Sequence, residues 1–537
     1  MPTEGAGAAG TAGSGPVSPP TGRRPGAAWF VGAGILLSRI SGVVREVVLA
    51  YYLGSSRVVD VISAGLRTPN IIQNLLGEGA LSASFIPVYA RMLEEGREEE
   101  AGRFAGAILG LLALVAFAAA LVGVLLAPAI AGLFIEWSAA DQELLARMLR
   151  ILFPMTATLV LSAWALGILN SHRRFFLSYV APVLWNGGII TAMVVAGRAL
   201  TAGETTIDGF AVAFAWGALA GAGLQLLVQL PTVASLLRGF RLSVGRGVEG
   251  VGRAIRNFGP VVAARGVVNL SALIDLWLAG LLAAGAVAHL ARAQMLYLLP
   301  ISLFAMSIAA SELPELSRST VAARESLADS VREALARARF FLLPSAAAYL
   351  VFGDALIAAL LQYGAFGSPD TTVVSWVLAA YALGLPASGA SRTLSSAFYA
   401  LEDTATPAKI ATLRVTVAIA VGASLMFPLD QFRVGPFGAG AVGLAAGSAV
   451  GAWLEYGLLR RSLSRTIGHH GPGVAGLARL VAACAAGGLV AVGARVGFAS
   501  AELPSLVVGI GTAGAFGVVY LGVAALLGEG RSLRFRS

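Results

Sequence analysis

Long apolar stretches recur along the whole chain, and they constrain its fold more than any other feature. After residue 27 the sequence holds about fourteen of them, each near the length that a helix needs to cross roughly 30 Å of hydrocarbon. Backbone groups in lipid must bond within their own segment, so such runs are expected to be helices. Hydrophobic residues make up 57% of the chain and charged residues only 12%, which is more apolar surface than a soluble fold can bury. An all-α integral membrane protein is therefore expected.

The apolar segments also set the expected bounds of the spanning helices. Residues 1–27 are rich in Gly, Ala, Pro and Ser, and they are expected to be disordered because they offer little to bury. The expected helices are 28–53, 58–82, 104–135, 146–170, 177–197, 207–230, 252–281, 286–312, 337–362, 372–400, 407–428, 437–458, 473–497 and 502–527.

Arginines gather in every second connection between these helices. The basic connections lie at 91–103, 173–174, 238–253, 318–337 and 460–465, with a further basic tail at 528–537. Since cytoplasmic loops carry an excess of Lys and Arg, both termini are predicted to be cytoplasmic. The net charge of +9 thereby follows from membrane topology, and no binding of nucleic acid is expected.

Two pairs of similar segments indicate an internal repeat. Ser84–Arg91 resembles Ser311–Arg318, and residues 165–170 correspond to 394–399 at nearly the same offset. An offset of six helices preserves orientation in the membrane, so it predicts two parallel lobes related by a pseudo-twofold axis along the membrane normal. The expected parts are an N-lobe at 28–240, a C-lobe at 250–465, and two additional helices at 473–527.

Three glycines, Gly443, Gly447 and Gly451, share one helix face. In lipid, such a stripe lets two helix backbones approach closely. Packing within the chain is the favoured interpretation, and a dimer interface is the alternative.

Several ionisable residues lie inside the apolar helices. A charge at the centre of a membrane helix costs roughly 2.5–3.5 kcal/mol on insertion scales, so such residues usually face a cavity or a partner. The planar fork of arginine binds phosphate oxygens in pairs. The charges therefore predict two facing cationic surfaces around a cavity for an anionic substrate such as a diphosphate. The residues concerned are Arg39, Arg45, Glu46, Asp60 and Arg67 in the first half, and Arg265, Asp275 and Arg292 in the second.

No motif of enzyme chemistry accompanies these charges. The 4 histidines do not occur in a metal-ligand spacing such as HExxH, and the chain has no Walker loop. The single cysteine, Cys484, excludes an internal disulfide and is expected to be a packing residue. The chain is expected to be a transporter without enzymatic activity, driven by an ion gradient, the membrane potential or the flux of substrate.

Four long blocks of sequence resemble the MurJ (MviN) family of lipid II flippases. The first block is 38–91, which begins Ser-Arg-Ile-Ser-Gly-Val-Val-Arg-Glu, and the others are 169–186, 299–318 and 379–411. This family belongs to the superfamily of multidrug, oligosaccharidyl-lipid and polysaccharide exporters. The resemblance implies a fourteen-helix, two-lobed transporter of the bacterial inner membrane. It would move undecaprenyl-diphosphate-linked peptidoglycan precursor from the inner to the outer leaflet by alternating access.

The resemblance also carries over individual positions. Arg39, Arg45 and Asp60 match charged positions that serve function in the family, while Glu46 stands where Asp is common and Glu78 lies in the Glu-Gly-Ala segment. The candidate substrate-binding residues are Arg39, Arg45, Glu46, Asp60, Arg67, Glu78, Arg265 and Arg292.

The chain departs from the family where arginines are common. Gln73 and Asn74 replace a pair of arginines, and Met295 replaces the arginine of the eighth helix. Arg292 lies almost one turn before Met295 and is the candidate substitute. These departures keep three alternatives open: a flippase for another polyprenyl-diphosphate saccharide, a cation-coupled multidrug exporter, and a non-transporting scaffold of wall synthesis.

A sodium site is the one cofactor that the resemblance suggests. Asp275 and Asp403 match acidic positions that are linked to sodium in some relatives. Two carboxylates with neighbouring carbonyl oxygens can hold a hard cation. The alternative is that Asp403 caps the following helix together with Thr404 and Thr406.

Overall fold

The computed structural model describes residues 25–77, 81–82, 84–245, 247–305, 321–468, 470–471 and 473–529, and these residues are helical almost throughout. Within them, 11 helices are long and apolar enough to cross a membrane. Three further long helices carry several of the charges noted above: α1 (Pro25–Leu53), α2 (Arg57–Leu76) and α9 (Val251–Gly280). Together they account for the predicted spans, so the expected all-α membrane architecture is confirmed. Glu78 and the segment Ser311–Arg318 lie outside the described residues.

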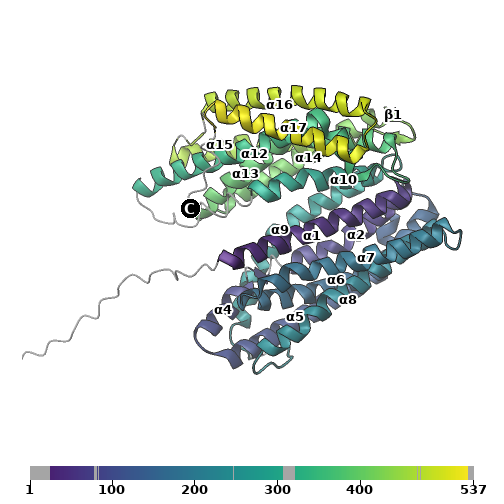
Figure 1. The fold of residues 1–537 in the computed structure, drawn as a ribbon. Coiled ribbons are helices and arrows are strands. Elements are labelled where there is room, and N and C mark those ends of the chain that lie inside the picture. The colour runs from purple at the N-terminus through teal and green to yellow at the C-terminus, as the bar shows by residue number, and fades with distance from the viewer. Residues whose placement is uncertain are drawn as a thin grey trace, which may run out of the picture.

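The helices form two groups that lie side by side with their axes roughly horizontal in Figure 1. The lower group is the N-lobe, in which the short α4 (Ile86–Glu94) follows α2. Its other helices are α5 (Glu98–Gly132), α6 (Ala139–Ser171), α7 (Phe175–Thr201) and α8 (Ile207–Leu236).

The upper group holds the C-lobe helices that follow α9, whereas α9 itself, the first helix of the C-lobe, is labelled beside α1 and α2 in Figure 1 and contacts α2. Between two of its helices a short antiparallel hairpin pairs β1 (Arg433–Val434) with β2 (Phe437–Gly438). The lobe continues with α10 (Ala286–Pro300), the π-helical turn η1 (Ile301–Ala305), α12 (Val321–Leu361), α13 (Ser368–Ala400), α14 (Ala405–Asp430) and α15 (Gly440–Ile467).

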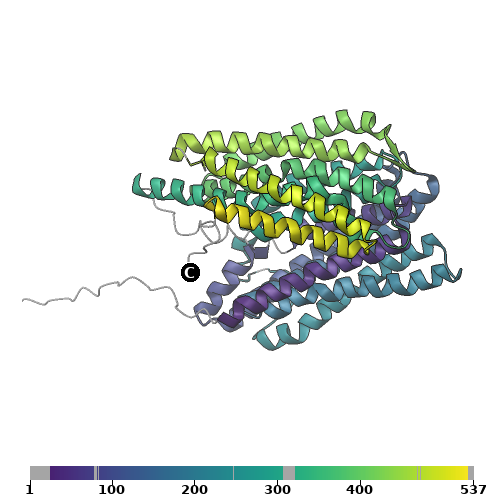
Figure 2. The same ribbon diagram turned by 45° about the horizontal axis from the view of Figure 1, so that its top comes forward.

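The two lobes repeat one pattern of helix pairing. In the N-lobe α5 packs on α6 and α7 on α8, while α6 also contacts α2 and α8. In the C-lobe α12 packs on α13 and α14 on α15, while α13 also contacts α10 and α15. The last two helices, α16 (Val474–Ser500) and α17 (Ser505–Leu526), pack against α12 on the outside of the C-lobe, where they are yellow in Figures 1 and 2. The arrangement is that of two parallel lobes with an added helix pair.

One helix starts far earlier than the apolar pattern predicts. The span was expected from residue 337, but α12 begins at Val321. Charged residues fill this extension, which hides it from a search for apolar runs. Leu327, Val331 and Leu335 nevertheless recur at every fourth position and belong to a separate buried cluster with residues of α13 and α15. The extension is therefore an amphipathic continuation of a membrane helix.

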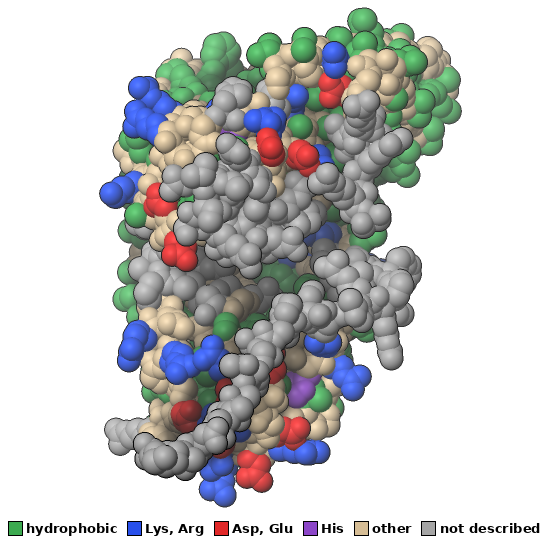
Figure 3. Space-filling view, turned by 90° about the vertical axis from the view of Figure 1, so that its left-hand side faces the viewer, with side chains coloured by type: hydrophobic (Ala, Val, Ile, Leu, Met, Phe, Trp, Pro, Cys, Tyr) green, Lys and Arg blue, Asp and Glu red, His purple; other side chains and the backbone are tan. Residues whose placement is uncertain are grey.

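The connections between helices lie at two ends of the bundle. The basic end carries the connections from α4 to α5, α6 to α7, α8 to α9, α13 to α14 and α15 to α16. The opposite end carries the connections from α1 to α2, α5 to α6, α7 to α8, α9 to α10, α12 to α13, α14 to α15 and α16 to α17. Figure 3 looks onto the basic end, which is on the left in Figure 1, and shows arginine (blue) and carboxylate (red) side chains around its rim.

The glycine stripe of α15 joins two helices of the same lobe. A Cβ atom added at Gly447 would lie 2.4 Å from the carbonyl oxygen of Ala418 and 2.5 Å from the backbone nitrogen of Gly422, both in α14. Gly443 and Gly451 face the same helix. The stripe therefore serves packing within the chain, as favoured from the sequence.

Substituting Gly447 by leucine is expected to force α14 and α15 apart. Overpacking of this kind typically costs roughly 1–3 kcal/mol, and the melting temperature in detergent should fall by several degrees. Gly457→Leu in the same helix is the matched control, because a Cβ atom there meets nothing within 4 Å. Equal melting temperatures for the two variants would show that this contact does not hold the lobe together.

Candidate functional site

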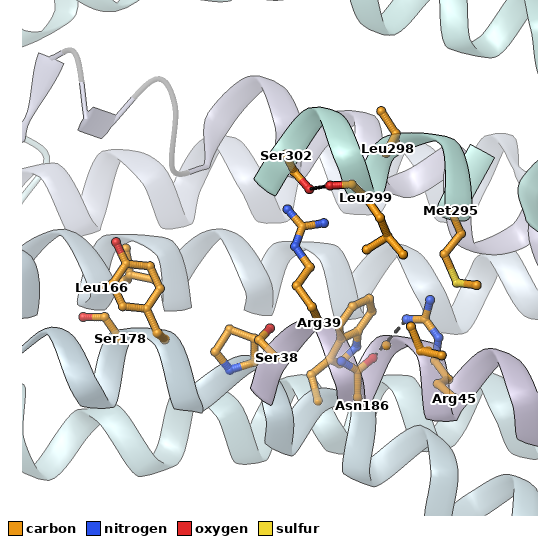
Figure 4. A pocket seen from close by; sticks show the side chains of 15 residues that line it. Ser38, Arg39, Arg45, Leu166, Ser178, Asn186, Met295, Leu298, Leu299 and Ser302 are labelled. Carbon is orange, nitrogen blue, oxygen red and sulfur yellow. Dashed lines mark hydrogen bonds between the residues drawn. The ribbon is translucent and has the colours of Figure 1, made fainter. Parts of the chain in front are cut away.

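A cavity of about 680 Å³ lies between the two lobes (Figure 4). Its N-lobe wall comes from α1, α6 and α7, and its C-lobe wall comes from α10 and η1. The contributing parts of α7 and α10 are the halves nearer the basic end, so the cavity lies on that side of the bundle. Its polar and aromatic lining includes Ser38, Arg39, Arg45, Ser178, Tyr179, Trp185, Asn186 and Ser302.

Arg45 is held against α7 inside this cavity. Its Nη1 donates a hydrogen bond to Oδ1 of Asn186 at 3.1 Å, and its guanidinium carbon lies 5.5 Å from the ring centroid of Trp185. Asn186 in turn donates to Oγ of Ser41 at 2.9 Å, which fixes its amide. Among the described residues, Asn186 is the only hydrogen-bond acceptor of Arg45, and the indole Nε1 of Trp185 has none. Since a guanidinium has five N–H donors, several stay available to an anion.

Arg39 lies in the same cavity, nearer the basic end. Its side chain is exposed, and Figure 4 shows it directed toward Leu299 and Ser302 of the C-lobe. Within the described part of the chain, no carboxylate forms an ion pair with Arg39. Asp60 does not pair with Arg39, because its carboxylate binds backbone amides of Gly285 and Ala288 at the other end of the molecule. Both cavity arginines therefore face the space between the lobes.

The C-lobe wall of the cavity differs from the prediction. Its described residues are Met295, Leu298, Leu299 and Ser302, and none of them is charged. Met295 lies opposite Arg45 in Figure 4. The expectation of two facing cationic surfaces is thus wrong for the described lining, in which both cations come from the N-lobe. The side chain of Arg265 lies outside the described residues.

Arg292 does not replace the missing cavity cation. It is fully buried at 0% exposure, and Nε donates to Glu46 at 3.1 Å while Nη1 donates to Oγ of Ser55 at 2.6 Å. Nη2 donates to the carbonyl oxygen of Gly54, also at 2.6 Å. Three residues turn a helix by about 300°, so Arg292 points roughly 60° away from Met295. Arg292 faces the α1–α2 connection of the N-lobe. Its partner Glu46 binds it there and does not line the cavity.

Asp60 joins the lobes at the opposite end. Its carboxylate accepts hydrogen bonds from the backbone amides of Gly285 (2.7 Å) and Ala288 (2.9 Å), at the start of α10. Arg57 also donates to it, at 3.3 Å. A carboxylate at a helix N-terminus satisfies free amides and complements the helix dipole. Asp60 of the N-lobe thus caps a helix of the C-lobe and makes no contact with the cavity.

Further contacts close this end of the molecule. The amide of Ala365 donates to the carbonyl oxygen of Tyr51 at 2.8 Å, and the indole of Trp137 donates to the carbonyl oxygen of Gly280 at 2.9 Å. The indole of Trp277 donates to the carbonyl oxygen of Leu133 at 2.8 Å. We call the contacts of Arg292, Asp60, Ala365, Trp137 and Trp277 the clasp. The clasp ties the lobes at the opposite end, while the cavity lies toward the basic end.

Arg67 forms a separate bridge between the lobes. It donates to Oε1 of Gln294 at 3.0 Å, and Gln294 donates to the hydroxyl of Tyr381 at 2.9 Å. The chain of bonds runs from α2 to α10 and α13. None of its members lines the described cavity, so Arg67 has a structural partner here and is not a cavity residue.

The two carboxylates of the predicted sodium site lie far apart. Asp275 is in the part of α9 near the opposite end, whereas Asp403 lies in the α13–α14 connection at the basic end. Roughly 30 Å of hydrocarbon thickness separates such ends, so one ion cannot bind both. The amide of Thr406 donates to Asp403 at 2.9 Å, and hydrogen bonds from this threonine lower the pKa of the Asp403 carboxyl. The capping alternative is therefore the better account, and no group of three or more metal-ligating side chains occurs among the described residues.

Comparison with known proteins places this architecture in a family. Residues 49–509 match the sequence model of the family described as lipid II flippase MurJ. The chain belongs to the MurJ family. It is 31% identical over 430 residues to a probable lipid II flippase MurJ of Rhizobium tropici, covering 79% of this chain and 78% of that protein. It is 30% identical over 432 residues to the lipid II flippase MurJ of Burkholderia cenocepacia, covering 79% and 80%.

Solved structures agree on the fold. A MurJ structure described as an inward closed conformation superposes with a TM-score of 0.72 at 22% identity, covering 94% of this chain and 99% of that one. An inward-facing multidrug transporter of the MATE family superposes with a TM-score of 0.61 at 16% identity, covering 82% and 98%. Both MurJ and MATE proteins thus share the two-lobed arrangement seen here.

Two residues that line the cavity of this MurJ-family chain were not predicted from its sequence. Asn186 and Trp185 hold Arg45, yet they were not identified as site residues. A signal existed in the sequence, since Asn186 is a polar side chain within an apolar span. What the sequence could not show is which of several polar groups in different helices meet at one cavity.

Proposed function

We propose that this chain is a lipid II flippase, which moves undecaprenyl-diphosphate-linked peptidoglycan precursor from the inner to the outer leaflet of the bacterial cytoplasmic membrane. The observation that carries the proposal is the pair of arginines, Arg39 and Arg45, that lines a cavity between two lobes. Guanidinium groups bind phosphate oxygens bidentately, and a diphosphate offers several such oxygens. Membership of the MurJ family supports the same substrate.

The expected orientation in the membrane follows from the charge of the two ends. The positive-inside rule places the basic end, and with it both termini, in the cytoplasm. The cavity then lies nearer the leaflet in which a cytoplasmic precursor first resides, and the clasp joins the lobes at the outer side. Loading of the diphosphate, release of the clasp and closure at the basic end would complete one transport step. No covalent bond is made or broken in it.

The size and polarity of the cavity fit part of such a substrate. Its volume of about 680 Å³ lies within the range of small-molecule sites, roughly 300–1,000 Å³. We assign it to the diphosphate and the adjoining sugar, while the polyprenyl chain stays in the surrounding lipid.

Reconstitution in proteoliposomes tests this proposal. The full chain should move labelled lipid II from one leaflet to the other, measured as the fraction of label that a membrane-impermeant quencher or enzyme can reach. Parallel vesicles with other polyprenyl-diphosphate sugars determine which saccharide moves fastest. Transport no faster than in protein-free vesicles, for every such lipid, would refute the flippase proposal and favour a scaffold without transport.

A further inference from the structure

A short chain of hydrogen bonds connects Arg45 to the backbone of its own helix through α7. The hydroxyl of Ser41 donates to the carbonyl oxygen of Ser38 at 2.8 Å, and the side-chain amide of Asn186 donates to the hydroxyl oxygen of Ser41 at 2.9 Å. The amide oxygen of Asn186 accepts from Arg45 at 3.1 Å (Figure 4). Ser38, Ser41 and Arg45 lie three and four residues apart in α1, so they share one face of the helix. We call these four residues the relay.

Each hydrogen bond of the relay has only one possible direction. A guanidinium can only donate, so Asn186 must turn its oxygen toward Arg45 and its amino group toward Ser41. The hydroxyl proton of Ser41 is used on the carbonyl of Ser38, which leaves the hydroxyl oxygen to accept. Ser41 and Asn186 are 8% and 5% exposed, so water has little access to either side chain. Ser41 therefore holds the amide of Asn186 in the one orientation that supports Arg45.

The helix that carries Asn186 is itself fixed from behind by glycines of α8. A Cβ atom added at Gly221 would lie 2.5 Å from the carbonyl oxygen of Trp185, and one at Gly217 would lie 2.9 Å from the carbonyl oxygen of Gly188. The backbones of α7 and α8 are therefore in contact beside the relay. Both helices belong to the N-lobe, as does α1, so movement of the two lobes relative to each other does not break the relay.

The group that holds Arg45 carries no charge. Arg292, by contrast, is bound by the carboxylate of Glu46, the residue that follows Arg45 in the chain. A carboxylate would cancel the charge that a diphosphate needs, whereas an amide orients the guanidinium and leaves its charge and most of its donors available. Arg39, the other arginine of the cavity, has no hydrogen-bond partner within the described part of the chain. The cavity thus contains one cation that is held in place and one that is not.

We propose that Ser41 is a positioning residue, which acts through Asn186 to hold Arg45 ready for the diphosphate of the substrate. This inference rests on the flippase function proposed above. Binding a diphosphate orders the side chains that contact it, and the ordering of one long side chain lowers affinity by roughly twofold to tenfold. Because the relay orders Arg45 in advance, this loss falls on Arg39 alone. Arg45 then anchors the diphosphate, and Arg39 adapts to it.

Binding of undecaprenyl diphosphate, which has the diphosphate but no sugar, tests the relay without requiring transport. It is measured on the purified full-length protein by native mass spectrometry. Ser41→Ala leaves the amide of Asn186 without its acceptor and should weaken binding about fivefold. Ser41→Thr keeps the hydroxyl and should restore most of the affinity. Ser171→Ala is the matched control and should bind as wild type does, because the Ser171 hydroxyl also donates to a carbonyl of its own helix, Gly167 at 2.9 Å, but lies outside the cavity.

A double-mutant cycle separates positioning from packing. Asn186→Ala removes the link between Ser41 and Arg45, so adding Ser41→Ala should have no further effect on binding. If Ser41 served only the packing of α1, its loss would weaken binding by the same factor with and without Asn186. Asn186→Asp tests the need for a neutral holder, since the carboxylate would keep Arg45 in place but cancel its charge. This variant should bind undecaprenyl diphosphate more weakly than Asn186→Ala.

Transport in proteoliposomes distinguishes failure of the relay from failure of the flippase function. Ser41→Ala should raise the apparent KM for lipid II about fivefold and leave the maximal rate near that of wild type, because positioning acts on binding. A wild-type protein that binds undecaprenyl diphosphate but moves no lipid would refute the flippase function and leave the relay standing. Equal binding by Ser41→Ala and wild type, or equal effects of Ser41→Ala in the two backgrounds, would overturn the relay. Absence of undecaprenyl diphosphate binding by wild type would refute both.

Discussion

Replacing Arg45 by alanine is expected to abolish transport of lipid II while the protein still inserts into the membrane. Arg45 is one of two cations in the described lining of the cavity, and Asn186 uses only one of its donors. A hydrogen bond to a charged group contributes roughly 1.5–3 kcal/mol, so loss of a bidentate contact lowers affinity for the diphosphate by about two orders of magnitude. The variant should fail to complement a strain depleted of its flippase, and an immunoblot of the membrane fraction should show wild-type amounts.

Two further substitutions make this result specific. Arg45→Lys keeps the charge and loses the planar fork, so it should retain partial transport. Arg174→Ala removes an exposed arginine from the basic end without touching the cavity and should complement fully. Normal growth of the Arg45→Ala strain would contradict the assignment of the cavity to the substrate.

The membrane fold could be predicted from the sequence because lipid imposes few solutions. Apolar length and the alternation of basic connections each depend on local sequence alone. Prediction failed at the start of α12, where an amphipathic extension leaves the apolar region. Its leucine stripe is buried by other helices of its own lobe, which is information that a window of hydropathy does not contain.

The functional site was predicted less completely, for a physical reason. A charge in a membrane helix needs either a water-filled cavity or a partner, and both solutions look alike in the sequence. Arg39 and Arg45 line a cavity, whereas Asp60 and Arg292 are held by partners in the other lobe. Helical spacing shows that Arg292 and Met295 point in different directions from α10. It cannot show that Glu46 of the N-lobe meets the Arg292 side chain. The clasp is therefore a property of two lobes in contact.

Replacing Arg292 by methionine is expected to release the clasp and expose the opposite end. The substitution removes three hydrogen bonds between the lobes and leaves the carboxylate of Glu46, only 16% exposed, without its cation. Breaking a buried ion pair by removal of one partner costs roughly 3–5 kcal/mol, which is enough to reverse a two-state equilibrium of a few kcal/mol. Because Cys484 is the only cysteine, Cys484→Ala gives a cysteine-free background for Ala286→Cys, a position 2% exposed within the clasp. A membrane-impermeant maleimide should label this cysteine at least tenfold faster in the Arg292→Met variant.

The contribution of the ion pair can be separated from that of the other bonds of Arg292. In the double variant Arg292→Met, Glu46→Leu no buried charge is left without a partner, so much of the lost stability should return. The bonds to Gly54 and Ser55 stay broken, and labelling of Ala286→Cys should therefore remain faster than in the parent protein. Arg292→Lys is the complementary control, since one ammonium group cannot reach three acceptors that a guanidinium fork spans, and it should label at an intermediate rate. Labelling as slow in Arg292→Met as in the parent would show that Asp60 and the tryptophans hold the lobes together without Arg292.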